Sequence, residues 1–272
     1  MPTGACASAA RPHIGIVDPS QKYQIDYAAY LGRLKERFHL ALTAMMVWVI
    51  VLGAFFLAQD RVFATRDFAI RPMQTEGLIG VITAPLLHGS MAHLASNAFA
   101  FLIIGTLAGS LYPRASLRAW PLIWLGSGLG TWFISLGGHH IGASGITVGL
   151  MFFLIGQGLR RRDKISLGAL MLALFFFGGM LLSILPQEQG ISWEYHLSGA
   201  AFGLLTGLAF AGLDERAPKR LYSWDLEPDS AESTTAQELD VPTAPEAPVI
   251  WHRPEPPHRN GDNVLPFRRR EP

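Results

Sequence analysis

The sequence predicts an all-α membrane protein, a bundle of six transmembrane helices, and its composition and patterning lead to that prediction. Half of the 272 residues are hydrophobic and only 16% are charged, whereas soluble globular domains carry about 25% charged residues. The apolar residues are concentrated in the middle of the chain, between two polar ends. In that middle region whole helical lengths lack the polar face that a helix of a soluble protein presents to water.

Six stretches without Asp, Glu, Lys or Arg are the expected membrane spans. About 20 apolar residues cross a hydrocarbon core of roughly 30 Å. The stretches cover residues 40–58, 93–112, 119–141, 144–159, 165–186 and 196–213. The fourth has only 16 residues. We therefore expect it to begin below the outer membrane surface, next to a polar cavity, where irregular backbone is tolerated.

Basic residues between these stretches predict the orientation. With the N-terminus inside, twelve Lys and Arg residues flank the helices on the inner side and three, Arg61, Arg66 and Arg71, lie outside. Cytoplasmic loops carry such an excess of basic residues, so both termini are predicted to be cytoplasmic. No apolar run before Leu40 could serve as a cleavable signal. We expect a multi-pass protein of the bacterial inner membrane.

The two polar ends are predicted to lie outside the fold. The expected parts are a cytoplasmic N-terminal segment (1–37), a six-helix core (38–213) and a Pro-rich cytoplasmic tail (214–272). The tail cannot bury enough apolar area to offset its ordering entropy, so we expect it to be disordered. The single cysteine, Cys6, excludes an internal disulfide. With 22 basic and 21 acidic residues, the chain gives no reason to expect a nucleic-acid partner.

Polar side chains inside a membrane are costly and usually functional, and the first group of them stands at the outer start of the second helix. His93 and Asn97 are four residues apart, so they share one helical face. This face would offer an imidazole and a carboxamide to the bundle interior. Hydrogen bonds that hold helices together are the alternative explanation.

The second group stands at the outer start of the fourth helix, where Ser144 is flanked by Gly142 and Gly145. Glycines let other groups approach the serine hydroxyl closely. A packing contact between small residues is the alternative.

The third group is His196, at the outer start of the sixth helix, where an interfacial histidine is the alternative. Small residues at a spacing of four let two membrane helices pack closely. This spacing occurs in the fourth and sixth helices, at Gly145 and Gly149 and at Gly199, Gly203 and Gly207. If the two rows face each other, Ser144 and His196 lie in the same layer.

Together the three groups predict acyl-transfer chemistry. A serine hydroxyl becomes a nucleophile when a neighbouring base removes its proton, and His196 can act as that base near neutral pH. The oxyanion that forms on an amide needs fixed donors. His93, Asn97 and the backbone N–H of Ser144 are the available donors. No Asp or Glu occupies these three helices, so the prediction is a Ser–His dyad.

Over roughly residues 40–213 the sequence resembles the rhomboid family of intramembrane serine proteases. The resemblance rests on His88-x4-His93-x3-Asn97, on Gly142-Ala-Ser-Gly145, and on His196-Leu-Ser-Gly199 with its glycine spacing. It implies Ser144 as nucleophile, His196 as general base, and His93 and Asn97 in the oxyanion hole. It also implies transmembrane protein substrates cut in or near a membrane span, with no metal or cofactor. In this family the fifth helix and the first outer loop are implicated in substrate access.

The sequence departs from the family pattern at three places. Val148 stands where many bacterial members have a Tyr stacked on the catalytic histidine. The Trp-Arg pair common in the first outer loop is absent, and a G-xxx-E-xxx-G pattern reads Gly105, Gly109, Pro113. These departures indicate a divergent branch of the family.

Two other function classes compete with a protease. One is a rhomboid-like pseudoprotease that acts as a membrane chaperone or substrate-retention factor, although such proteins typically lack the serine or the histidine. The other is a small transporter, which would often show internal symmetry that this sequence lacks. His139 and His140 could in principle bind a metal, but two neighbours on a loop rarely suffice.

Overall fold

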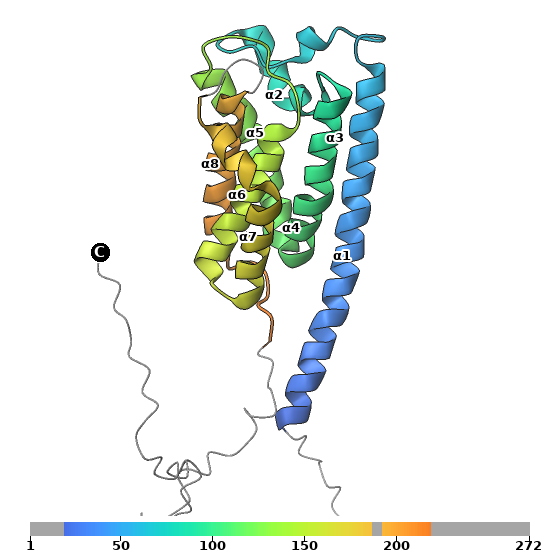
Figure 1. Ribbon diagram of the computed structural model, residues 1–272, viewed down its shortest axis with the longest axis vertical. Coiled ribbons are helices and arrows are strands. Elements are labelled where there is room, and N and C mark those ends of the chain that lie inside the picture. Colours follow the sequence, from blue (N-terminus) through green and yellow to red (C-terminus); the bar gives the residue numbers. More distant parts are fainter. Residues whose placement is uncertain (1–18, 187–191, 219–272) are drawn as a thin grey trace, which may run out of the picture. The chain divides into compact units, whose positions relative to one another are not determined.

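The computed structural model describes residues 19–186 and 192–218, and this part of the chain is built from helices and loops (Figure 1). The pattern of internal contacts divides the chain into two units, with the boundary after Leu221. All described residues belong to the first unit. The expectations for Cys6 and for the tail beyond residue 218 fall outside the described residues.

Six long helical segments form most of the described chain (Figure 1). They are α1 (Pro19–Ala58), α3 (Met91–Ala100) with η4 (Phe101–Gly105) and α4 (Thr106–Leu111), α5 (Pro113–Ile134), α6 (Ser144–Arg161), α7 (Lys164–Phe177) with η5 (Gly178–Ile184), and α8 (Trp193–Ala209). Four short elements join α1 to α3, namely η1 (Thr65–Phe68), η2 (Thr75–Ile79), α2 (Gly80–Thr83) and η3 (Ala84–Leu86).

The protein is an all-α integral membrane protein. Three helical segments are long and apolar enough to cross a membrane, over residues 21–58, 91–111 and 164–184. The all-α membrane class is thereby confirmed, while the number of six spans stays a prediction. Among the other three segments, α6 is central, because most of its side chains are buried and it packs against α5, α7 and α8.

Several helix boundaries differ from the predicted spans. The first helix begins at Pro19, about twenty residues before the apolar run, because the polar residues between them continue the helix without a break. The third segment is shifted toward the N-terminus, to Pro113–Ile134. Pro113 suits the first turn of a helix because it has no N–H to leave unpaired. The segment ends before Gly138, whose positive φ of 90° does not continue a helix.

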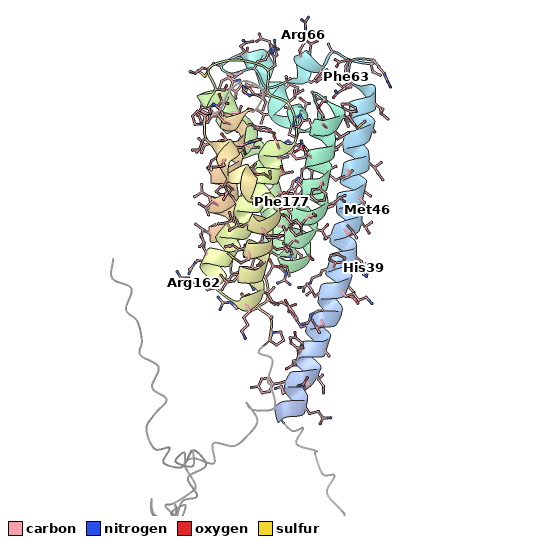
Figure 2. The ribbon with its side chains drawn as sticks, in the orientation of Figure 1. His39, Met46, Phe63, Arg66, Arg162 and Phe177 are labelled. Carbon is pink, nitrogen blue, oxygen red and sulfur yellow. The ribbon has the colours of Figure 1, made fainter. Side chains whose placement is uncertain are left out.

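At one end of the bundle, which we call the α2 end, hydrogen bonds fix the segments 59–90 and 135–143. Within the first segment, the Gln59 side chain binds both the backbone N–H and the backbone carbonyl of His88. Ile70 and His140 exchange two backbone hydrogen bonds of 3.0 Å. Figure 2 shows Arg66 at the α2 end and Arg162 at the opposite end, where α6 turns into α7. The hydrogen bonds give the loop before α6 a fixed position.

Candidate active site

A cavity of about 1150 Å³ lies among α3, α6, α7 with η5, and α8, near the α2 end. Its lining includes all four side chains that the sequence singled out, Ser144, His196, His93 and Asn97. Phe177, which Figure 2 shows near the middle of the bundle, also lines it. The cavity therefore reaches from the α2 end into the depth of the helices.

Ser144 is the first residue of α6. The first four N–H groups of a helix have no partner within the helix, and the helix dipole places partial positive charge there. The backbone N–H of Ser144 belongs to this set. The Ser144 side chain is half-buried, so the residue presents a hydroxyl and a backbone donor at the same point of the cavity wall.

His93 and Asn97 are positioned by the start of α3. The Ser90 hydroxyl caps the helix by accepting a hydrogen bond from the His93 N–H at 3.1 Å. The Asn97 amide donates one hydrogen bond to the His93 carbonyl at 3.2 Å. A carboxamide carries two N–H donors, and among the described residues the Asn97 amide makes this one hydrogen bond, so its second donor can serve a ligand in the cavity. Asn97 is buried, with 3% of its surface exposed.

The His93 ring is held between two neighbours. It packs edge-on against the ring of His88, with centroids 5.1 Å apart. On another side it lies so close to Gly142 that a Cβ on that glycine would meet the ring at 2.6 Å from Nε2. Gly142 also donates a backbone hydrogen bond to the Ala84 carbonyl. The loop before α6 thus positions both Ser144 and the His93 ring.

His196 lies in the first turn of α8 and is largely buried. Its Nδ1 atom lies 2.8 Å from the Ser183 hydroxyl and 3.3 Å from the Ser183 carbonyl. Among the described residues the structure has no hydrogen bond between the Ser144 hydroxyl and His196. Without substrate, hydrogen bonds between catalytic groups are often long and tighten only in the complex.

α6 and α8 approach each other through glycines. A Cβ on Gly199 would collide with the carbonyl of Gly145, and one on Gly203 would collide with the carbonyl of Gly149. A Cβ on Gly207 would lie 3.0 Å from the Cα of Gly156. This backbone contact brings the helix starts that carry Ser144 and His196 to the same cavity.

A second polar group in the cavity was not foreseen from the sequence. The Ser135 hydroxyl lies 2.9 Å from Nε2 of His140 and 3.1 Å from a Glu194 carboxylate oxygen. The other ring nitrogen of His140 contacts the Ser192 hydroxyl. Burial lowers the pKa of His140. These hydrogen bonds join the loop before α6 to the start of α8. The sequence gives no sign of them, because the residues come from segments that are far apart in the chain.

The contacts of His140 also bear on its possible role as a metal ligand. Both of its ring nitrogens are occupied by hydrogen bonds within the protein, since Nε2 also contacts the Gly137 carbonyl at 3.0 Å. Within residues 19–186 and 192–218, no cluster of three His, Cys, Asp or Glu side chains could hold a metal ion.

Comparison with known proteins gives a family match over this region. A family model described as the Rhomboid domain matches residues 75–212, which is half of the chain. The chain is 38% identical over 157 residues to the uncharacterized protein Rv1337 of Mycobacterium tuberculosis (strain ATCC 25618 / H37Rv), covering 54% of this chain and 65% of that protein. It is 34% identical over 146 residues to the uncharacterized protein ML1171 of Mycobacterium leprae (strain TN), covering 50% and 57%. The chain thus spans less than two thirds of the length of these curated relatives.

Proposed function

The chain belongs to the rhomboid family, and from that premise we propose that it is an intramembrane serine endopeptidase with a Ser144–His196 dyad. The observation that carries the proposal is the cavity in which side chains from the starts of α3, α6 and α8 meet. A hydroxyl, an imidazole and several hydrogen-bond donors in one partly buried cavity are what acyl transfer requires.

In the proposed reaction the Ser144 hydroxyl attacks the carbonyl carbon of a peptide bond while Nε2 of His196 takes its proton. The oxyanion of the tetrahedral intermediate accepts hydrogen bonds from the Ser144 N–H and from the side chains of His93 and Asn97. Collapse breaks the C–N bond, and His196 gives its proton to the leaving amine. Water, activated by His196, then hydrolyses the Ser144 ester.

The proposed substrates are membrane proteins that are cut in or near a transmembrane segment. The cavity is surrounded by helices of a membrane protein, and its lining combines polar groups with the aromatic rings of Phe99, Phe176 and Phe177. An unwound membrane segment could place its backbone at Ser144 while its apolar side chains contact these rings. We further propose a bacterial inner-membrane location with both termini in the cytoplasm, on the basis of the basic residues in the loops.

The test is cleavage of a reporter transmembrane substrate by the purified full chain in reconstituted membranes. We expect the wild type to cleave, and the Ser144→Ala and His196→Ala variants to lose activity by about 10³-fold or more, because each removes a group that the bond-breaking step needs. Ser110→Ala is a suitable control because, among the described residues, the Ser110 hydroxyl bonds to carbonyls of its own helix, α4, and to no residue of the cavity.

Equal cleavage by all variants would overturn the dyad. Absence of cleavage by the wild type, across substrates with different membrane segments, would instead favour the pseudoprotease alternative. In that case the same cavity would bind membrane segments without cutting them, and cross-linking of a substrate to the wild type would detect this binding.

A further inference from the structure

The environment of His196 contains a feature that the dyad alone does not explain. Ser183 lies in η5, the last part of the fifth helical segment, thirteen residues before His196. Its hydroxyl is 2.8 Å from Nδ1 of His196, and its backbone carbonyl is 3.3 Å from the same atom. The hydroxyl oxygen and the carbonyl oxygen of Ser183 therefore both contact the same ring nitrogen of His196.

The direction of these hydrogen bonds follows from counting protons. A serine hydroxyl has one proton to donate, and the Ser183 hydroxyl donates it to the Met180 carbonyl at 2.6 Å. Toward His196 the hydroxyl can then only accept. The Ser183 carbonyl is also an acceptor. The contact with the carbonyl therefore requires the proton on Nδ1, and the hydroxyl, with its own proton directed at Met180, accepts from the same N–H.

This assignment fixes the tautomer of the neutral ring. A neutral imidazole carries one N–H, so a proton on Nδ1 leaves Nε2 with a free lone pair. A general base for Ser144 needs this lone pair. The opposite tautomer would direct an N–H at the serine and could not remove its proton.

We propose that Ser183 is a positioning residue for His196, one that holds the ring in the Nδ1–H tautomer and fixes its orientation toward Ser144. This inference rests on the proposed protease function. It also supplies the support of the histidine that Val148, a fully buried aliphatic residue, cannot give by ring stacking. A base oriented by a third group is the general arrangement of an activated nucleophile, and here the third group is neutral.

The test compares Ser183→Ala with Ser183→Thr, which keeps a hydroxyl on the same carbon. Cleavage kinetics are measured in reconstituted membranes, together with ¹⁵N NMR of the histidine rings, with the His196 signals assigned by their loss in His196→Gln. Ser110→Ala is the matched control, since it also removes a hydroxyl that donates to a carbonyl three residues earlier.

We expect Ser183→Ala to lower kcat by about three- to tenfold, the effect of one neutral hydrogen bond, with KM changed less than about twofold. The backbone carbonyl remains as a weaker acceptor, which limits the loss. Ser183→Thr and Ser110→Ala should keep wild-type kcat. In the spectra His196 should be in the Nδ1–H form in the wild type and in a mixture of forms in Ser183→Ala.

Wild-type kcat and an unchanged tautomer in Ser183→Ala would overturn the proposal and leave the dyad intact. An Nε2–H form of His196 in the wild type would also overturn it. If the wild type cleaves nothing, the protease function fails, and the proposal that Ser183 prepares a general base is overturned with it. The spectra then show whether the contact with Ser183 sets the tautomer for some other purpose.

Discussion

Gly142 has a backbone φ of +108° and lies against the imidazole ring of His93. Two separate physical reasons therefore require glycine at this position. A side chain would be strained by the backbone conformation, and its Cβ would displace a ring that we propose as an oxyanion donor. The two reasons can be separated, because Gly138 has a similar φ of +90° but a Cβ placed there would lie 3.9 Å from its nearest neighbour, His140 Nε2.

We predict that Gly142→Ala lowers the rate of cleavage about 10²-fold, the cost of losing one oxyanion donor. Gly138→Ala carries only the backbone strain, so it should lower thermal stability while its cleavage rate stays within a few-fold of the wild type. Both variants are measured by reporter cleavage and thermal unfolding. Equal losses of activity in the two would show that strain, and not the position of His93, accounts for the effect.

At the scale of elements, the contact between α6 and α8 depends on glycines whose α-hydrogens face the other backbone. A Cβ on Gly203 would meet the Gly149 carbonyl carbon at 2.7 Å and its Cα at 2.8 Å. Such a clash cannot be relieved by rotating a side chain, since the opposing atoms are backbone. Close approach of helix backbones is a main source of stability between membrane helices.

Gly203→Ala should therefore lower the unfolding temperature strongly, with a free-energy cost of about 1–3 kcal/mol, the usual cost of overpacking. Gly168→Ala in α7 is the control, because a Cβ there meets no atom within 4 Å. Since alanine favours the helix over glycine, this variant should be neutral or more stable by up to about 1 kcal/mol. Thermal unfolding in detergent or lipid is the measurement, and a stable Gly203→Ala protein would contradict the contact.

Much of this element-level arrangement could be predicted from the sequence. The rows of glycines that begin at Gly145 and Gly199 predict that α6 and α8 touch if the two rows face each other, and the positions of His93 and His196 at helix starts predict a common layer. These signals are local patterns combined with the length of a membrane span. They need no knowledge of how the loops fold.

The contacts of Ser183 and Glu194 could not be predicted in this way. Ser183 was hidden in an apolar run that reads as one continuous helix, whereas the chain changes to the tighter η5 at Gly178. It is within η5 that the Ser183 hydroxyl contacts Nδ1 of His196. The Glu194 contact depends on the path of the loop 135–143, which brings Ser135 to the first turn of α8. Neither follows from periodicity, because both arise from irregular backbone.

For the described unit as a whole, polar interactions at the end opposite α2 join segments that are far apart in sequence. The guanidinium of Arg161, buried at the end of α6, donates to the carbonyls of Ala211, Asp214 and Glu215 at 2.9–3.2 Å. The Asp214 carboxylate accepts the first N–H groups of α5 at 2.9 and 3.0 Å. The packed chain thus continues beyond the predicted core boundary at residue 213.

The same segment also reaches α1. The Glu215 carboxylate pairs with Arg37 at 2.9 Å and with Arg33 at 3.3 Å. The pair with Arg33 is exposed and the pair with Arg37 is partly exposed, so these two ion pairs contribute little by themselves. Arg161 is different, because its side chain is only 4% exposed and it holds the backbone from which Asp214 and Glu215 project. Its loss would release the connections to α1 and α5 together.

We predict that Arg161→Ala destabilises the protein by about 2–4 kcal/mol, because three carbonyls would lose a charged hydrogen-bond donor in a buried place. Arg161→Lys should recover only part of this, since an ammonium group lacks the planar fork that reaches several acceptors. Arg160→Ala, an exposed neighbour, should stay within about 0.5 kcal/mol of the wild type. Thermal unfolding gives the order of the three variants, and protease accessibility of residues 210–218 reports whether this segment has been released. A stable Arg161→Ala protein with a protected segment would show that helix packing alone holds the α8 end in place.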